Sequence, residues 1–167
     1  MEIHFSPYKG DYYEKGILGK KVLVLGHTYP CNEYLTKEGC KEIPNVENLY
    51  CRGCGFTQRC SDATEKTVKE YMGNEWGERE GGRRKATHTK FLKSLLPDIH
   101  HLEAYKYVAF YNFVQIAVSA KEGLLGKADE KYYELSVDPF LKVLDMYHPD
   151  CIIIWGKHVF YKLLFYL

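Results

Sequence analysis

The sequence predicts an α/β protein in which buried parallel strands alternate with helices. Three short apolar runs end in polar residues, at 21–30 (KVLVLGHTYP), 107–115 (YVAFYNFVQ) and 151–158 (CIIIWGKH). Helix-like segments lie between them, and strands separated by helices are typical of a parallel sheet. A parallel strand that opens into Gly and a polar tip delivers side chains to the crevice at its carboxyl end. The pattern therefore indicates a site along one edge of the sheet.

Composition predicts one domain covering residues 1–167, large enough to bury a core without disulfides. A net charge of +1 with 27% charged residues neither favours nor excludes a nucleic-acid partner. No run reaches the ~18 apolar residues of a membrane span, and the first residues lack the apolar region of a signal peptide. We therefore expect a cytoplasmic protein with no membrane partner.

The first strand is expected at residues 22–25, after an N-terminal arm, residues 1–20, that ends in a Gly-rich turn. Residues 31–60 have little periodicity and hold most of the cysteines. They predict a long, structured, Cys-rich insertion.

Two helices are expected before the second strand. The first covers residues 62–72, with Asp62 and Glu65 as a capping box and Gly73 at its end. A Gly-rich, charged loop, residues 73–85, follows it. The second helix covers residues 87–96, where four apolar residues share one face, and Pro97 stops it.

The second strand is expected at residues 107–113, and residues 116–137 are ambiguous because two glycines interrupt a weak helical pattern. Asp138 and Pro139 then predict a helix start, with Asp at the N-cap and Pro at the first helical position. That helix is expected to end at His148.

The third strand, residues 151–155, is apolar on both faces and is expected inside a sheet, with Cys151 in the core. Residues 159–167 form an apolar helix, which needs a further strand to pack against. The expectation is that a final strand is missing from this chain. The exposed edge of the third strand would then favour pairing with another copy, giving a homodimer.

The cysteines provide a second signal. Cys51 and Cys54 form a CxxC knuckle, flanked by Cys40 and Cys60, and four thiolates can close a tetrahedral zinc site. We expect structural zinc first, with free thiols and an iron–sulfur cluster as the alternatives.

The three strand ends, in order, resemble the uracil-DNA glycosylase superfamily at residues 22–30, 108–115 and 152–158. In that family the first strand ends in a loop that positions the catalytic water, a later strand ends in an Asn that reads the base, and a third ends in Trp-Gly. The resemblance implies a three-layer α/β/α sandwich around a parallel four-stranded sheet, of which this chain supplies three strands.

The resemblance also implies a function in DNA repair, hydrolysis of the N-glycosidic bond of a flipped uracil-like base in DNA. Asn112 would read the base, Gly26 would allow close approach and Tyr29 would wall the pocket. His27 or Thr28 would position water. Such hydrolysis needs no cofactor, so any metal would be structural.

Two departures from the family pattern leave catalysis open. Thr28 stands roughly where several branches place Asp or Asn, and a His-Pro-Ser-like motif does not follow the third strand up to Leu167. These departures favour the alternative of a non-catalytic module on the same scaffold, with or without zinc, that binds nucleic acid, a nucleotide or a protein. A third alternative is a zinc-stabilised interaction protein whose strand ends do no chemistry.

Each site residue also has a simpler interpretation. One amide of Asn112 can satisfy both the O4 acceptor and the N3–H donor of a pyrimidine, but it can equally cap a strand end. His27 titrates near neutrality and is alternatively a plain loop histidine. Gly156 and His158 lie at a helix start, which attracts phosphate, and His158 is alternatively a solvated first-turn side chain.

Overall fold

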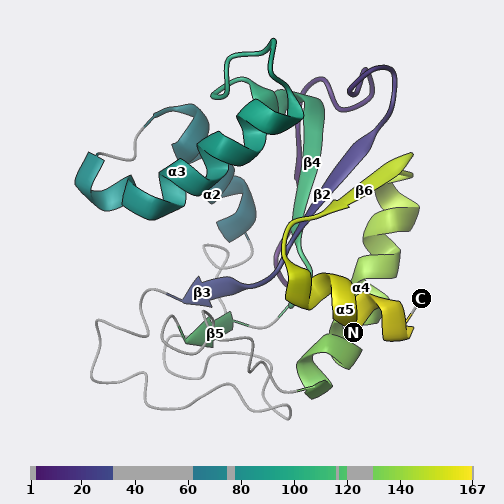
Figure 1. Ribbon diagram of the computed structural model, residues 1–167. Coiled ribbons are helices and arrows are strands. Elements are labelled where there is room, and N and C mark those ends of the chain that lie inside the picture. Colours follow the sequence, from purple (N-terminus) through teal and green to yellow (C-terminus); the bar gives the residue numbers. More distant parts are fainter. Residues whose placement is uncertain (1–2, 32–61, 75–77, 116, 120–129, 167) are drawn as a thin grey trace.

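The computed structural model describes residues 3–31, 62–74, 78–115, 117–119 and 130–166, and its centre is a four-stranded sheet (Figure 1). The strands lie in the order β1 (Tyr8–Lys9), β4 (Val108–Asn112), β2 (Val22–Gly26), β6 (Cys151–Ile154). The α/β class and the three predicted strands are confirmed, and β4, β2 and β6 are parallel. An all-parallel sheet is wrong, because β1 from the N-terminal arm pairs antiparallel with β4.

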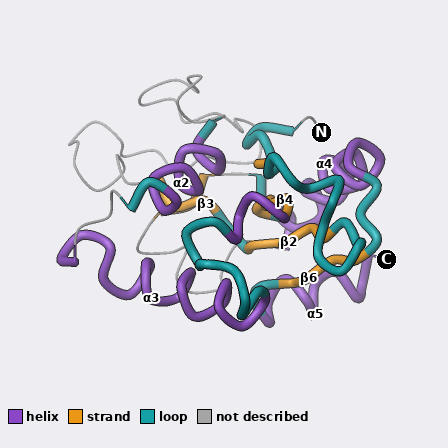
Figure 2. The backbone as a smooth tube through the Cα atoms, turned by 90° about the horizontal axis from the view of Figure 1, so that it is seen from above, coloured by secondary structure: helices purple, strands orange, loops and turns teal. Residues whose placement is uncertain are grey.

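Successive side chains of β2 and β4 point to opposite faces of the sheet and build two separate cores. Val22 and Val24 pack in the core that contains residues of α2 (Ala63–Met72) and α3 (Glu78–Leu95). Leu23 and Leu25 pack in the core that contains residues of α4 (Glu130–Tyr147) and α5 (Lys157–Tyr166). Figure 2 shows the two helix pairs on either side of the strands. No helix among the described residues is long and apolar enough to cross a membrane.

A second, two-stranded sheet lies just beyond the carboxyl ends of β2 and β4. It consists of β3 (Tyr29–Cys31) and β5 (Ala117–Ser119), which pair in parallel. A short 3-10 helix, η2 (Ala104–Tyr107), leads into β4. The residues that follow β2 and β4 therefore lie in the turns that connect the four-stranded sheet to the two-stranded sheet.

α2 lies where the sequence predicts it, but the capping box is wrong. Asp62 makes no side-chain cap bond, and its backbone (φ −87°, ψ 7°) is not the extended one of a capping residue. Gly73 ends the helix in the right-handed conformation, and Asn74 takes the left-handed one (φ 55°).

The sequence patterns place two helix starts too late. α3 begins at Glu78, within the predicted loop, and α4 begins at Glu130 so that Pro139 lies inside it. A proline within a helix removes one backbone hydrogen bond. Burial of Tyr133, Phe140 and Val143 in the core outweighs that loss, because packing of an apolar face supplies most helix stability in proteins.

β6 is an edge strand, whereas the sequence predicts an interior one. In the described part of the chain it pairs with β2 alone, and its isoleucines are half-buried. Cys151 is exposed, so its assignment to the core is wrong. Helix α5 follows and buries Val159 and Leu163 against the α4 side of the sheet.

Candidate functional site

The carboxyl ends of β2 and β4 meet at Gly26 and Asn112, which are paired in the parallel register. The side-chain oxygen of Asn112 lies so close to Gly26 that a Cβ atom there would be 2.2 Å from Oδ1. Only glycine leaves room for the amide in this position. The sequence-predicted neighbours Gly26 and Asn112 are therefore in direct contact, as expected of two strand ends on one edge.

Asn112 is 9% exposed as a residue, and no hydrogen bond within the described residues engages its side-chain amide. Buried amides are normally paired, since an unpaired one costs about 1–3 kcal/mol. The amide atoms of Asn112 do not belong to the fully buried side-chain atoms without a partner in the described part of the chain, so they keep some exposure to solvent. The interpretation of Asn112 as a simple cap finds no supporting contact in the described residues.

Gln115 holds this strand end in place, a role that the sequence patterns did not assign. Its Oε1 accepts hydrogen bonds from the backbone N–H groups of His4 (3.0 Å) and Phe5 (2.9 Å). Its Nε2 donates to the backbone carbonyl of Asn112 at 2.7 Å. A second amide at the end of the same apolar run is the signal that could have identified it.

His27 follows β2 directly and packs among aromatic rings from two helices. Its Nε2 lies 2.6 Å from the hydroxyl of Tyr133 in α4, and its ring stacks on the rings of Tyr133 and His158. Its backbone carbonyl accepts a hydrogen bond from the N–H of Val114 at 2.9 Å. Burial lowers the pKa of His27 below its usual value, and the charge of His158 lowers it further. The imidazole is therefore neutral at pH 7.

The beginning of α5 supplies the basic side of the site. His158 lies in the first turn of α5, with its ring 6.1 Å from that of His27, and Gly156 precedes the helix with a φ of 147°. The ammonium of Lys162 lies 5.7 Å over the Tyr133 ring. The sequence patterns assign neither Tyr133 nor Lys162 to the site. Tyr133 belongs to the segment whose pattern is ambiguous, and nothing in the sequence places it beside His27.

The remaining predicted site residues are placed only in part. Thr28 is half-buried, and its hydroxyl has no hydrogen bond to another described residue. Tyr29 contributes backbone to β3, while its side chain is outside the description. The four predicted zinc ligands, Cys40, Cys51, Cys54 and Cys60, lie outside the described residues. Among residues that are described, no group of three or more His, Cys, Asp or Glu could hold a metal.

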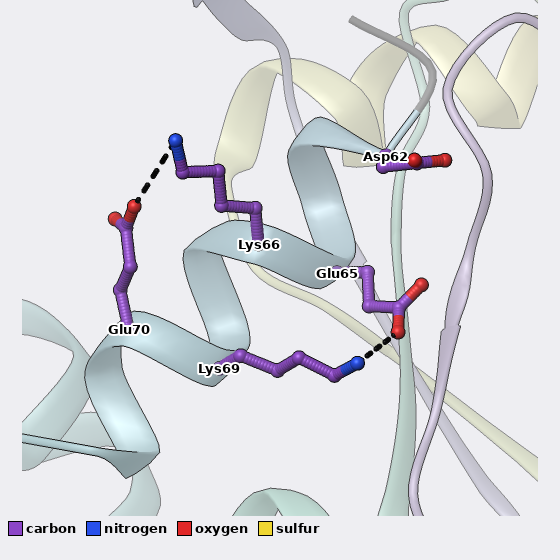
Figure 3. Close-up of a pocket in the computed structure, with 5 residues that line it drawn as sticks. All are labelled: Asp62, Glu65, Lys66, Lys69 and Glu70. Carbon is purple, nitrogen blue, oxygen red and sulfur yellow. Dashed lines mark ion pairs between the residues drawn. The ribbon is translucent and has the colours of Figure 1, made fainter. Parts of the chain in front are cut away.

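A charged depression on α2 is separate from these strand ends (Figure 3). Its volume is about 340 Å³, and it is lined by Asp62, Glu65, Lys66, Lys69 and Glu70. Glu65 pairs with Lys69, and Glu70 pairs with Lys66 at 3.7 Å. Because the two lysines compensate Glu65 and Glu70 on an open helix surface, only the single negative charge of Asp62 remains, and the depression offers little excess charge to a ligand.

Comparison with known proteins adds no relative to this picture, since no family model, no curated protein and no solved structure matches the chain. The functional argument accordingly depends on the geometry of the strand ends.

Proposed function

We propose that this chain binds a flipped, uracil-like base of DNA at the carboxyl ends of β2 and β4 and hydrolyses its N-glycosidic bond. The observation that carries the proposal is the side-chain amide of Asn112, which has no partner in the described residues although the residue is only 9% exposed. Uracil presents an O4 acceptor and an N3–H donor. The Asn112 N–H can donate to O4 while Oδ1 accepts from N3–H, which pairs the whole amide.

The proposal includes the scaffold, a three-layer α/β/α sandwich. Two cores on opposite faces of the sheet support it, one shared with α2 and α3 and the other with α4 and α5. In such sheets ligands bind in the crevice beyond the carboxyl ends of the parallel strands. Gly26, His27 and Asn112 occupy that position.

Hydrolysis would use His27 as the group that positions and deprotonates water. Water oxygen forms a bond to the sugar C1′, the bond from C1′ to the base nitrogen breaks, and its electron pair leaves with the base. With Nε2–H donating to the Tyr133 oxygen, Nδ1 of the neutral His27 keeps the lone pair that accepts the water proton. The Thr28 hydroxyl can hold the same water. None of the strand-end residues 26–28, 112–115 and 155–158 is a carboxylate, which leaves this role to the imidazole.

The α5 N-terminus would hold a DNA phosphate next to the flipped nucleotide. Backbone N–H groups at a helix start favour anions, and His158 is exposed in the first turn, just after Gly156. Phosphate contacts of this kind position DNA without reading its sequence. Base choice would then depend on Asn112 alone among the residues described at this edge.

A second candidate function is base binding without hydrolysis. The specific observation that favours it is the lack of a carboxylate at the strand ends named above, since a neutral imidazole brings no negative charge to stabilise the positive charge that develops on the sugar. The two functions share the Asn112 contact and differ only in the water step.

A single assay separates the two functions. Wild type and Asn112→Ala are given a single-stranded oligonucleotide with one uracil, and both uracil release and affinity are measured. The first function predicts that the rate of uracil release falls about 100-fold in Asn112→Ala, because the substitution removes two hydrogen bonds to the base. Binding without uracil release supports the second function. Binding that depends neither on uracil nor on Asn112 contradicts both functions. Asn74→Gly is the control, because it removes an exposed amide at a left-handed position that glycine adopts freely.

A further inference from the structure

The outer edge of β6 carries backbone groups that the sheet does not use. The N–H group of Cys151 donates to the carbonyl of Lys21, just before β2, at 3.1 Å, and the N–H group of Trp155 donates to the carbonyl of Leu25 in β2 at 2.8 Å. In a parallel ladder alternate residues bond to the same neighbour. Ile152 and Ile154 therefore direct their N–H and C=O groups away from β2, where no strand follows in the described sheet.

This edge lacks the features that usually protect edge strands. Natural edges carry charged side chains, proline or bulges that prevent pairing with another chain. β6 reads CIII, with neither charge nor proline, and it pairs with β2 in unbroken register. The strand is therefore suited to accept a further strand.

The outward face of α5 continues this unpartnered surface. Val159 and Leu163 face the core, whereas the opposite side of the helix is apolar and exposed at Phe160 (46%), Tyr161 (59%), Leu164 (65%) and Phe165 (82%). Figure 2 shows α5 beside β6, at the end of the sheet away from β4. These four side chains expose roughly 500 Å². A stable interface buries about 800 Å² per partner, so the helix face supplies more than half of that area and a paired strand adds to it.

We propose that a second copy of this chain covers the surface, with β6 pairing antiparallel to β6 of the second copy. A twofold axis perpendicular to the sheet would join two four-stranded sheets into one of eight strands and set the two α5 helices side by side. Charge supports this arrangement. Antiparallel pairing brings the exposed Asp150 before one strand toward the exposed Lys157 after the other, and does so twice.

The test is the molar mass in solution, measured by light scattering or sedimentation at about 100 μM, where a dimer with micromolar Kd is populated. Wild type is expected to be dimeric and Tyr161→Glu monomeric, because the charge would be buried against the second α5. Tyr12→Glu is the matched control, since Tyr12 is similarly exposed (48%) but lies by β1 at the opposite edge. A monomeric wild type, or a Tyr161→Glu variant that stays dimeric, overturns the proposal.

Hydrogen exchange tests the strand pairing itself and does not depend on a variant. On concentrating wild type, exchange of the Ile152 and Ile154 amides is expected to slow about tenfold while that of Ile153, directed at β2, is unchanged. Exchange at Ile152 and Ile154 that does not change with concentration in a dimeric sample places the interface elsewhere and overturns the proposal. Far-UV circular dichroism confirms that Tyr161→Glu remains folded.

Discussion

His27 is held by side chains that approach it from two helices. Tyr133 comes from α4 and His158 from α5, and both stack on the imidazole. The hydrogen bond to the Tyr133 hydroxyl fixes which nitrogen faces away. Such a ring is oriented before any ligand arrives, which is what a water-positioning group requires.

The substitution His158→Gln should raise the pKa of His27 toward its ordinary value. It removes the neighbouring positive charge, the second cause of the lowered pKa, and leaves burial, the first cause, in place. NMR titration of the His27 ring protons measures the change. His100→Gln removes an exposed histidine elsewhere and should leave that titration unaltered. An unchanged or lower His27 pKa in His158→Gln would show that the two rings do not interact electrostatically.

Gly26→Ala should abolish base binding in a folded protein. The new Cβ atom would lie 2.2 Å from Oδ1 of Asn112 and would displace the amide. We expect the free energy of unfolding to fall by about 1–3 kcal/mol from overpacking. Chemical denaturation and oligonucleotide affinity measure the two effects separately.

Gly19→Ala provides the contrast for that experiment. Gly19 has a φ of 73° and no atom within 4 Å of an added Cβ, so alanine strains the backbone without touching the site. It should lower stability by about 1 kcal/mol and leave affinity unchanged. If Gly26→Ala binds as well as Gly19→Ala, the Asn112 amide is not the base-reading group.

At the scale of elements, β1 depends on long-range contacts for its place in the sheet. It has two residues, too few to show any periodicity, and its position comes from pairing with β4 and from the Gln115 side chain nearby. The parallel strands could be predicted because runs of four or five residues that are apolar at successive positions are distinctive. The start of α4 could not, because Pro139 is a strong start signal that tertiary packing overrides.

Gln115→Met should loosen the N-terminal arm from β4. The change keeps side-chain size but leaves the N–H groups of His4 and Phe5 without their acceptor. Orphaning two buried donors should lower the free energy of unfolding by about 3 kcal/mol. Denaturation gives the stability, and faster exchange of the His4 and Phe5 amides gives the location. Unchanged exchange at those amides would show that the arm is held by β1 pairing alone.

For the molecule as a whole, the sequence predicts which edge of the sheet carries the candidate site, but it predicts only some of the residues that form the site. Gly26, His27 and Asn112 come together because parallel strands end on one side, and His158 joins them through the helix after β6. Tyr133 is far away along the chain in a segment without a clear period, so only the folded structure brings it to His27. The same limit applies to β6, whose apolar composition is typical of an interior strand although it lies at the edge.

Stability of the whole molecule should fall as the pH falls below neutrality. The pKa values of His27 and His101 are lowered, chiefly by burial, so the unfolded chain binds protons at these residues before the folded chain does. The free energy of unfolding therefore declines as the pH drops through the ordinary histidine range and levels off below the folded pKa values. Urea denaturation at pH 7 and pH 5 measures it. In His27→Gln the free energy of unfolding should decline less between pH 7 and pH 5 than in wild type. An equal decline would show that the burial of His27 does not contribute to the pH dependence of stability.

The most direct test of the account is an NMR titration that observes the side-chain amide of Asn112. Single-stranded oligonucleotides carrying one uracil, or one abasic site at the same place, are added to labelled protein. The account predicts that the Asn112 amide resonances shift with uracil, which offers the amide both an acceptor and a donor, and not with the abasic oligonucleotide, which offers neither. Binding of the uracil oligonucleotide with no change at the Asn112 amide would contradict it.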